Sequence, residues 1–167
     1  MQNVYEIERI MPLKIGKKSP AFAAEIQDGT KISLKDYKDK WVVLYFYPKD
    51  NTSGCTIEAC DFRDNMERIT AMDTVVIGVS PDNAKSHTNF IAKHNLNFNL
   101  ITDKEKVILN KYDVMGEKKM YGRIYIGVIR TTYIIGHDGK IKHVFSPVKV
   151  KGHVDAVIEK LEELRTS

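Results

Sequence analysis

A cysteine lies where an apolar strand is expected to lead into a helix. Residues 41–47 are all aromatic or aliphatic, which predicts a strand covered on both faces, as in the centre of an α/β sheet. Pro48 ends that strand, and the turn and capping residues that follow predict a helix beginning near Ser53 or Gly54. Cys55 would then lie in the first turn of this helix.

The position of Cys55 predicts nucleophilic chemistry. A helix N-terminus stabilises negative charge, and the thiolate is the reactive form of cysteine. Thr52, one turn earlier, offers a hydroxyl that can donate to the sulfur or to an oxygen that the sulfur attacks. Glu58 shares the helix side with Cys55 and would repel a thiolate, so we expect it to hold an arginine that supplies positive charge. An apolar stripe should turn this side toward the protein body: Cys55, Ala59, Phe62, Met66 and Ile69.

The second cysteine, Cys60, lies five positions beyond Cys55. On a helix this spacing means about 7.5 Å of rise and about 140° of rotation. A disulfide needs Cα atoms within about 7 Å and converging Cβ vectors, so the two cysteines cannot join while the helix is intact. If they react together the first turns must unwind, and Gly54 and Thr56, with their low helix propensity, make that opening feasible.

These residues resemble a known family. Pro48, Thr52 and Cys55 are spaced as in the active-site signature of peroxiredoxins, and the Cys55–Cys60 spacing is similar to the subgroup called bacterioferritin comigratory protein, or peroxiredoxin Q. Ser53 departs from the family, where many relatives have proline. Four further segments carry the resemblance along the chain: Gly16-x-x-x-Pro20-x-Phe22, Tyr47-Pro48-Lys49-Asp50, Asp61-Phe62-Arg63-Asp64 and Arg130-Thr131-Thr132-Tyr133-Ile134-Ile135.

The resemblance implies roles for six residues. Cys55 matches the peroxidatic cysteine, which attacks the peroxide and becomes a sulfenic acid. Cys60 matches the resolving cysteine, which forms a disulfide that thioredoxin or a similar dithiol reduces. The remaining positions match the threonine that binds the peroxide, the proline that shields the sulfur, the arginine that stabilises the thiolate and the glutamate that orients this arginine: Thr52, Pro48, Arg130 and Glu58. No metal, haem or flavin is implied.

Structural explanations compete with these roles. A cysteine on an apolar helix face is frequently only a small core residue. Arg130 could be a surface strand residue, but its apolar neighbours favour an inward position, where a buried guanidinium demands an anion. Two other functions also stay open: a thiol–disulfide oxidoreductase, which the C-x4-C spacing fits poorly, and a peroxide-sensing redox protein.

Composition describes an ordinary globular chain. The 167 residues suit one domain, 1–167, and 26 basic against 22 acidic side chains give a net charge of +4. The basic residues are scattered, so we expect no nucleic-acid partner. Neither a signal peptide nor a membrane span is visible, which predicts a cytoplasmic protein. If Cys60 forms the disulfide with Cys55 of its own chain, no second subunit is needed, which favours a monomer.

The remaining pattern predicts a mixed central sheet with helices on both faces, as in a thioredoxin-like fold. We expect the following elements: a hairpin of 22–26 and 31–34, a strand at 74–80, a helix from Pro81 to about His94, a strand at 99–101, a helix at 104–112, a second hairpin of 130–136 and 141–145, and a C-terminal helix with Val154, Val157, Ile158, Leu161 and Leu164 on its apolar face.

Three further features predict structure rather than chemistry. His87 and His94 lie seven apart on one expected helix, and a surface role is favoured over a metal site. The two cysteines do not have the spacing of zinc ligands. The glycines between Gly116 and Gly127 form no phosphate-binding pattern, so this segment is expected to be a flexible loop.

Overall fold

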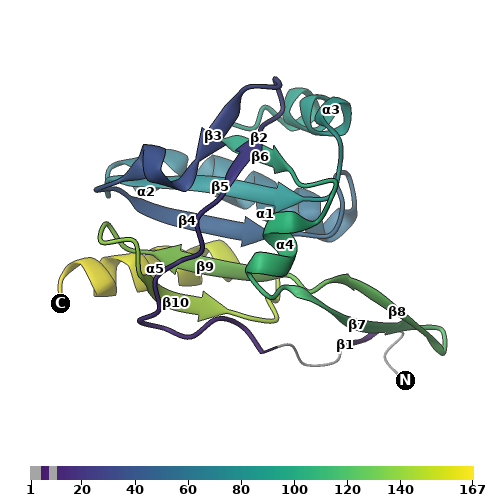
Figure 1. Ribbon diagram of the computed structural model, residues 1–167. Helices are drawn as coiled ribbons and strands as arrows, with labels where there is room; N and C mark the ends of the chain where they lie inside the picture. Colours follow the sequence, from purple (N-terminus) through teal and green to yellow (C-terminus); the bar gives the residue numbers. More distant parts are fainter. Residues whose placement is uncertain (1–4, 8–10) are drawn as a thin grey trace.

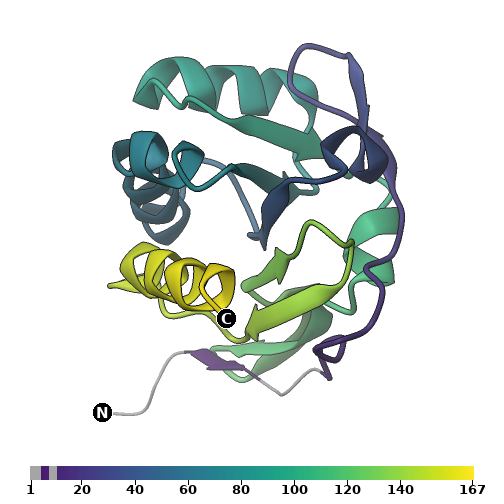
Figure 2. The same cartoon turned by 90° about the vertical axis from the view of Figure 1, so that its left-hand side faces the viewer.

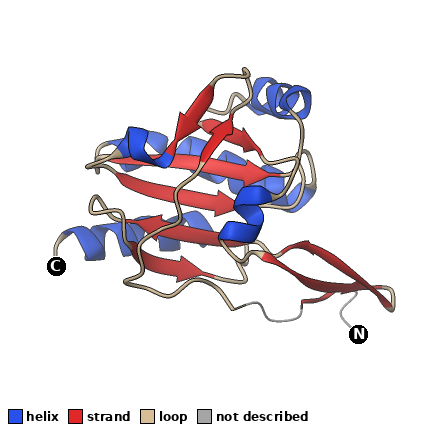
Figure 3. Ribbon diagram, viewed as in Figure 1, coloured by secondary structure: helices blue, strands red, loops and turns tan. Residues whose placement is uncertain are grey.

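The computed structural model describes residues 5–7 and 11–167. Its centre is a five-stranded mixed sheet in the order β10-β9-β4-β5-β6 (Figures 1 and 3). The strand β4 is parallel to β5, which is parallel to β6, while β9 is antiparallel to both β4 and β10. The five strands are β4 (Trp41–Phe46), β5 (Thr74–Ser80), β6 (Asn99–Thr102), β9 (Thr131–Ile135) and β10 (Ile141–Phe145).

All six residues of β4 are buried, which confirms the prediction of a strand covered on both faces. Its alternating side chains enter two different cores. Val43 and Tyr45 belong to one apolar cluster, and Val42 and Leu44 belong to the other. The strand therefore holds the two layers of the protein together and delivers the chain to the cysteine helix.

Helices cover both faces of the sheet, as expected for the α/β class. Figure 2 shows α1, α2, α3 and the yellow C-terminal helix on one side of the sheet, and the green α4 on the other. The helices are α1 (Ser53–Asp64), α2 (Met66–Thr70), α3 (Ala84–His94), α4 (Val107–Lys111) and α5 (His153–Arg165). Within the described residues, none of them is long and apolar enough to cross a membrane.

The cysteine helix begins at Ser53, as predicted, and buries Cys55, Ala59 and Phe62. The stripe continues less regularly, because α1 ends at Asp64 and the short α2 begins at Met66, which is only partly buried. The C-terminal helix α5 buries four of its five predicted apolar residues, and the fifth, Leu164, is partly buried: the buried ones are Val154, Val157, Ile158 and Leu161.

Several element boundaries differ from the predictions. The hairpin of β2 (Ala23–Glu25) and β3 (Lys31–Ser33) is confirmed, and a single 3₁₀ turn η1 (Leu34–Tyr37) leads from it toward β4. Helix α3 starts at Ala84 rather than at Pro81, because the side chain of Asn83 accepts the Ser86 N–H and caps the helix there.

The prediction of a flexible loop between Gly116 and Gly127 is wrong. Strands β7 (Met115–Met120) and β8 (Arg123–Val128) pair as an antiparallel hairpin, and β1 (Tyr5–Ile7) pairs with β7. The hairpin projects from the main sheet (Figure 1). Tyr121 and Gly122 both have positive φ, 51° and 78°, as a tight two-residue hairpin turn requires. The sequence of β8 does alternate, with Ile124, Ile126 and Val128 at every second position, but Ile124 and Ile126 are exposed, so this alternation does not mark a buried face.

Candidate active site

The site lies where the end of β4 leads through residues 47–52 into α1. The backbone N–H of Thr56 donates to the Thr52 carbonyl and closes the first helical turn. Cys55 therefore lies at the helix start, as predicted, and its side chain is buried, with 1% exposed. At this place the sulfur is shielded from water and lies near the positive end of the helix dipole.

Arg130 lies against the sulfur of Cys55. Its Nη2 donates to Sγ at 3.2 Å, and its Nη1 donates to Oε1 of Glu58 at 2.8 Å. Burial alone would lower the pKa of Arg130, but Glu58 and Cys55 raise it above its ordinary value, so the guanidinium keeps its charge. The structure thus bears out the inward orientation of Arg130 and its pairing with Glu58.

Gly54 makes this approach possible. A Cβ built at Gly54 would lie 3.2 Å from Nη2 of Arg130, closer than most side chains tolerate. The sequence suggested Gly54 only as a residue that loosens the helix. In the structure, its missing side chain also gives the guanidinium room at the start of α1.

Glu58 is fully buried, and burial raises its pKa to about 7 even though the charge of Arg130 lowers it. Among the described residues, its Oε2 atom has no hydrogen-bond partner. Nε2 of His153 lies 3.9 Å from this atom. Glu58 therefore changes charge near neutral pH, directly behind the arginine that contacts the sulfur.

His153 and Thr132 complete this environment and were not predicted. Nε2 of His153 lies 2.9 Å from Oγ1 of Thr132. Burial and the charge of Arg130 lower the pKa of His153 to about 4, so its ring is neutral at physiological pH. A signal for His153 was present, because it lies four and eight residues before Val157 and Leu161 and so shares their buried face.

Thr52 and Pro48 are near the cysteine in the chain, but the structure does not place either of them on the sulfur. The hydroxyl of Thr52 donates to the Lys49 carbonyl at 3.0 Å, and the residue is exposed. Pro48 is half-buried after the end of β4. Their roles toward a peroxide stay predictions from the resemblance.

Cys60 lies on the same unbroken helix as Cys55, and both thiols are free. Cys60 is partly buried, whereas Cys55 is buried. This is the geometry expected from the spacing, in which the helix keeps the two sulfurs from bonding.

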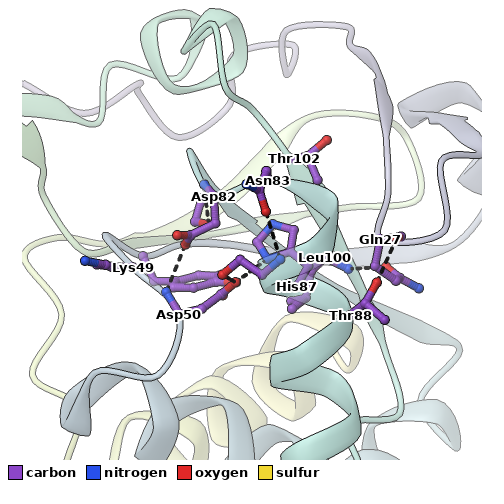
Figure 4. Close-up of polar contacts among 12 residues, drawn as sticks. Gln27, Lys49, Asp50, Asp82, Asn83, His87, Thr88, Leu100 and Thr102 are labelled. Carbon is purple, nitrogen blue, oxygen red and sulfur yellow. Dashed lines mark hydrogen bonds and ion pairs between the residues drawn. The ribbon is translucent and has the colours of Figure 1, made fainter.

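The prediction of a surface role is wrong for His87. His94, the other histidine of that helix, is half-buried. His87 is fully buried, with Nδ1 2.7 Å from Oδ2 of Asp50 and Nε2 2.9 Å from the Ile101 carbonyl oxygen (Figure 4). Within residues 5–7 and 11–167, Asp50, Asp82 and His87 form the one group whose ligand-type atoms all lie within 4.8 Å of one another. Their side chains are already engaged in hydrogen bonds to the protein.

Comparison with known proteins shows the family of the chain. The chain matches the AhpC/TSA family over residues 15–144. It is 44% identical over 154 residues to peroxiredoxin Bcp of Bacillus subtilis, covering 92% of this chain and 98% of that protein. It is 40% identical over 152 residues to peroxiredoxin Bcp of Escherichia coli, covering 91% of this chain and 97% of that protein.

Solved structures show the same likeness. A variant of Xylella fastidiosa peroxiredoxin Q superposes with a TM-score of 0.83 at 34% identity, covering 96% of this chain and 98% of that chain. A bacterioferritin comigratory protein of Xanthomonas campestris, studied for its alkyl peroxide reduction activity, gives a TM-score of 0.81 at 36% identity. The match covers 85% of this chain and 90% of that chain.

The thioredoxin-like fold and a buried cysteine paired with an arginine at a helix start are those of a thiol peroxidase. The chain belongs to the AhpC/TSA family and, within it, to the peroxiredoxins of the Bcp and Q type.

Proposed function

We propose that Cys55 is the peroxidatic cysteine of this peroxidase. Its thiolate attacks one oxygen of a hydroperoxide, the O–O bond breaks, and the other oxygen takes a proton and leaves as water or an alcohol. Cys55 becomes a sulfenic acid. The observation that carries the assignment is the 3.2 Å contact between Nη2 of Arg130 and Sγ of Cys55. This donor stabilises the thiolate and the negative charge that develops on the leaving oxygen.

Glu58 acts through Arg130 as a positioning residue. It holds Nη1 at 2.8 Å, which leaves Nη2 free to face the sulfur. Protonation of Glu58 keeps the hydrogen bond but removes a negative charge that would otherwise compete with the thiolate for the guanidinium.

Thr52 and Pro48 would complete the peroxide site. Rotation of the Thr52 hydroxyl away from the Lys49 carbonyl would free its proton for a peroxide oxygen. Pro48 has no N–H to hydrate and would help to keep water from the sulfur.

Cys60 is proposed as the resolving cysteine. Its thiol attacks the sulfenic sulfur of Cys55, and the hydroxyl leaves as water while the disulfide forms. The first turns of α1 must unwind for this step. An external dithiol, thioredoxin or a similar protein, then returns two electrons and two protons to the pair. Since the two thiols supply both electrons that reduce the peroxide, the cycle needs no other redox group.

The burial of Cys55 favours a peroxidase over an exchanger of protein disulfides. A thiol with 1% exposure admits a small peroxide more readily than the disulfide of another protein. A peroxide-sensing protein would use the same first steps, but it would show negligible turnover when reductant is supplied.

Resolution within one chain needs no second subunit, and we therefore propose a monomer, built as one domain over 1–167. We also propose a cytoplasmic enzyme. The scattered basic residues support the proposal that it has no nucleic-acid partner.

Stopped-flow reaction of the reduced protein with hydrogen peroxide tests the assignment. We expect Cys55→Ser to abolish peroxide consumption, and Cys60→Ser to retain one turnover but to lose recycling by thioredoxin. Peroxide consumption by Cys55→Ser at the parent rate would show that another group does the chemistry.

A further inference from the structure

A buried polar network next to the active-site loop is not used in the chemistry above. Asp50 has 4% and His87 has 0% of its surface exposed. The carboxylate of Asp50 accepts hydrogen bonds from the Tyr47 hydroxyl at 2.6 Å and the Ser86 hydroxyl at 2.8 Å, and His87 Nδ1 lies 2.7 Å from its Oδ2. The network joins the loop before the cysteine helix to α3 (Figure 4).

The hydrogen-bond roles in the pair are constrained. Nε2 of His87 faces the Ile101 carbonyl, which can only accept, so Nε2 carries a proton. Nδ1 and Oδ2 of Asp50, 2.7 Å apart, form the second hydrogen bond of the ring, so both ring nitrogens of His87 are held by the protein.

The backbone of Asp50 is also held. Its N–H donates to Oδ2 of Asp82 at 2.9 Å, and the same oxygen accepts the Ser80 hydroxyl at 2.7 Å. These bonds occupy the oxygen atoms that a metal ion would need, so the group is better explained as an anchor for the loop than as a metal site.

The chain immediately after Asp50 is attached differently. Asn51, Thr52 and Ser53 are exposed, and the Thr52 hydroxyl bonds only to Lys49 of its own loop in the part of the chain that the structure describes. The firmly held backbone therefore ends at Asp50, five residues before the cysteine that must move when α1 unwinds.

We propose that the Asp50–His87 pair is a positioning anchor that fixes the upstream boundary of the segment that unwinds, and that it holds Thr52 and Cys55 in the geometry required for peroxide attack. This inference rests on the proposed roles of Cys55 and Cys60. When the anchor is loosened, unwinding can extend upstream of Asp50, and the added conformational entropy favours the unwound form. The change therefore slows the peroxide step, which needs the folded loop, and accelerates disulfide formation, which needs the unwound helix.

Three variants test the anchor. Ser86→Ala removes one donor from Asp50 at a partly buried position where alanine also suits the helix. His87→Gln can keep the bond to the Ile101 carbonyl but not the bond to Asp50. His87→Asn can keep a donor at the Nδ1 position and so the bond to Asp50. Tyr112→Phe is the control, because it removes a hydrogen bond to the Pro20 carbonyl on the other face of the sheet.

Two rate constants are measured in each variant: oxidation of Cys55 by hydrogen peroxide in stopped flow, and formation of the Cys55–Cys60 disulfide by rapid quench and mass spectrometry. Loss of one hydrogen bond corresponds to roughly a fivefold shift in an equilibrium. We therefore expect the ratio of disulfide formation to oxidation to rise about fivefold in Ser86→Ala and about tenfold or more in His87→Gln. His87→Asn should lie nearer the parent, and Tyr112→Phe should leave the ratio unchanged.

The outcomes separate this inference from the proposed function. A parent protein that does not react with peroxide would overturn the proposed function itself. If the parent reacts and forms the disulfide, but Ser86→Ala leaves the ratio unchanged, the anchor is overturned alone. Equal ratios for folded His87→Gln and His87→Asn would also overturn it. Should the His87 variants not fold, the Ser86→Ala ratio decides the question.

Discussion

The guanidinium of Arg130 reaches the sulfur of Cys55 at 3.2 Å across 75 positions of the chain. The contact exists because β9, which begins at Thr131, lies beside β4, and β4 delivers the chain to the start of α1. Two neighbouring strands thus bring a cation and a nucleophile together where β4 ends and β9 begins.

Replacing Arg130 by methionine should slow the oxidation of Cys55 by hydrogen peroxide about 100-fold or more, since it removes the charged donor that faces the sulfur. Arg130→Lys should recover only part of this rate, because a single ammonium cannot hold Glu58 and the sulfur together in the same fork. The second-order rate constant from stopped flow is the measurement. Arg123→Met, on the exposed part of β8, is the control and should react like the parent.

The space left by Gly54 gives a second prediction. Gly54→Ala places a methyl group 3.2 Å from Nη2 of Arg130 and displaces it, so peroxide oxidation should slow about tenfold. The free energy of unfolding should not fall, because alanine favours a helix by about 1 kcal/mol over glycine. Ser53→Ala adds helix propensity without approaching the arginine, and it should keep the parent rate. A parent-like rate for Gly54→Ala would show that the close approach has no importance for the reaction.

Glu58 predicts a particular pH dependence of stability. Its pKa is about 7 in the folded protein against the ordinary 4.5, so the folded state binds this proton more tightly than the unfolded state. The corresponding stability is fully present below pH 4.5 and is lost as the pH rises through 7. The loss in the free energy of unfolding amounts to about 3 kcal/mol once the pH is above this range.

Urea unfolding of the parent and of Glu58→Gln over this pH range measures the effect. Glutamine keeps an acceptor for Arg130 but does not ionise, so the parent should lose stability relative to the variant between pH 4.5 and 8. His153 acts in the opposite direction, because its pKa falls to about 4 and its stabilisation disappears as the pH drops from 6.5. It is present in both proteins, and the comparison removes most of its contribution. A constant difference across the range would contradict the raised pKa.

Local sequence patterns predicted the elements that carry the chemistry. The unbroken apolar run before Pro48 and the capping residues after it located β4 and the start of α1, and the apolar surroundings of Arg130 predicted its inward position. The resemblance then suggested Cys55 as its partner. These predictions succeeded because each depends on residues adjacent in the chain or on a charged residue among apolar neighbours, and both can be recognised in the sequence.

The rest of the site depends on contacts between distant segments. Asp50 and His87 are 37 positions apart, and neither has a local pattern that distinguishes a buried hydrogen-bonded histidine from an exposed one. The hairpin of β7 and β8 was missed for a related reason, because its stability comes from backbone pairing while many of its side chains remain in solvent. The alternation of Ile124, Ile126 and Val128 was outweighed in the prediction by the glycines between Gly116 and Gly127.

The most direct test of the account is the mass of the reduced protein after one equivalent of hydrogen peroxide, followed by digestion and peptide mapping. The account predicts a single chain that has lost two hydrogen atoms and contains a Cys55–Cys60 disulfide, whereas Cys60→Ser should gain one oxygen atom on Cys55. A parent protein whose Cys55 stays reduced while peroxide disappears, or whose Cys55 is linked only to another chain, would contradict it.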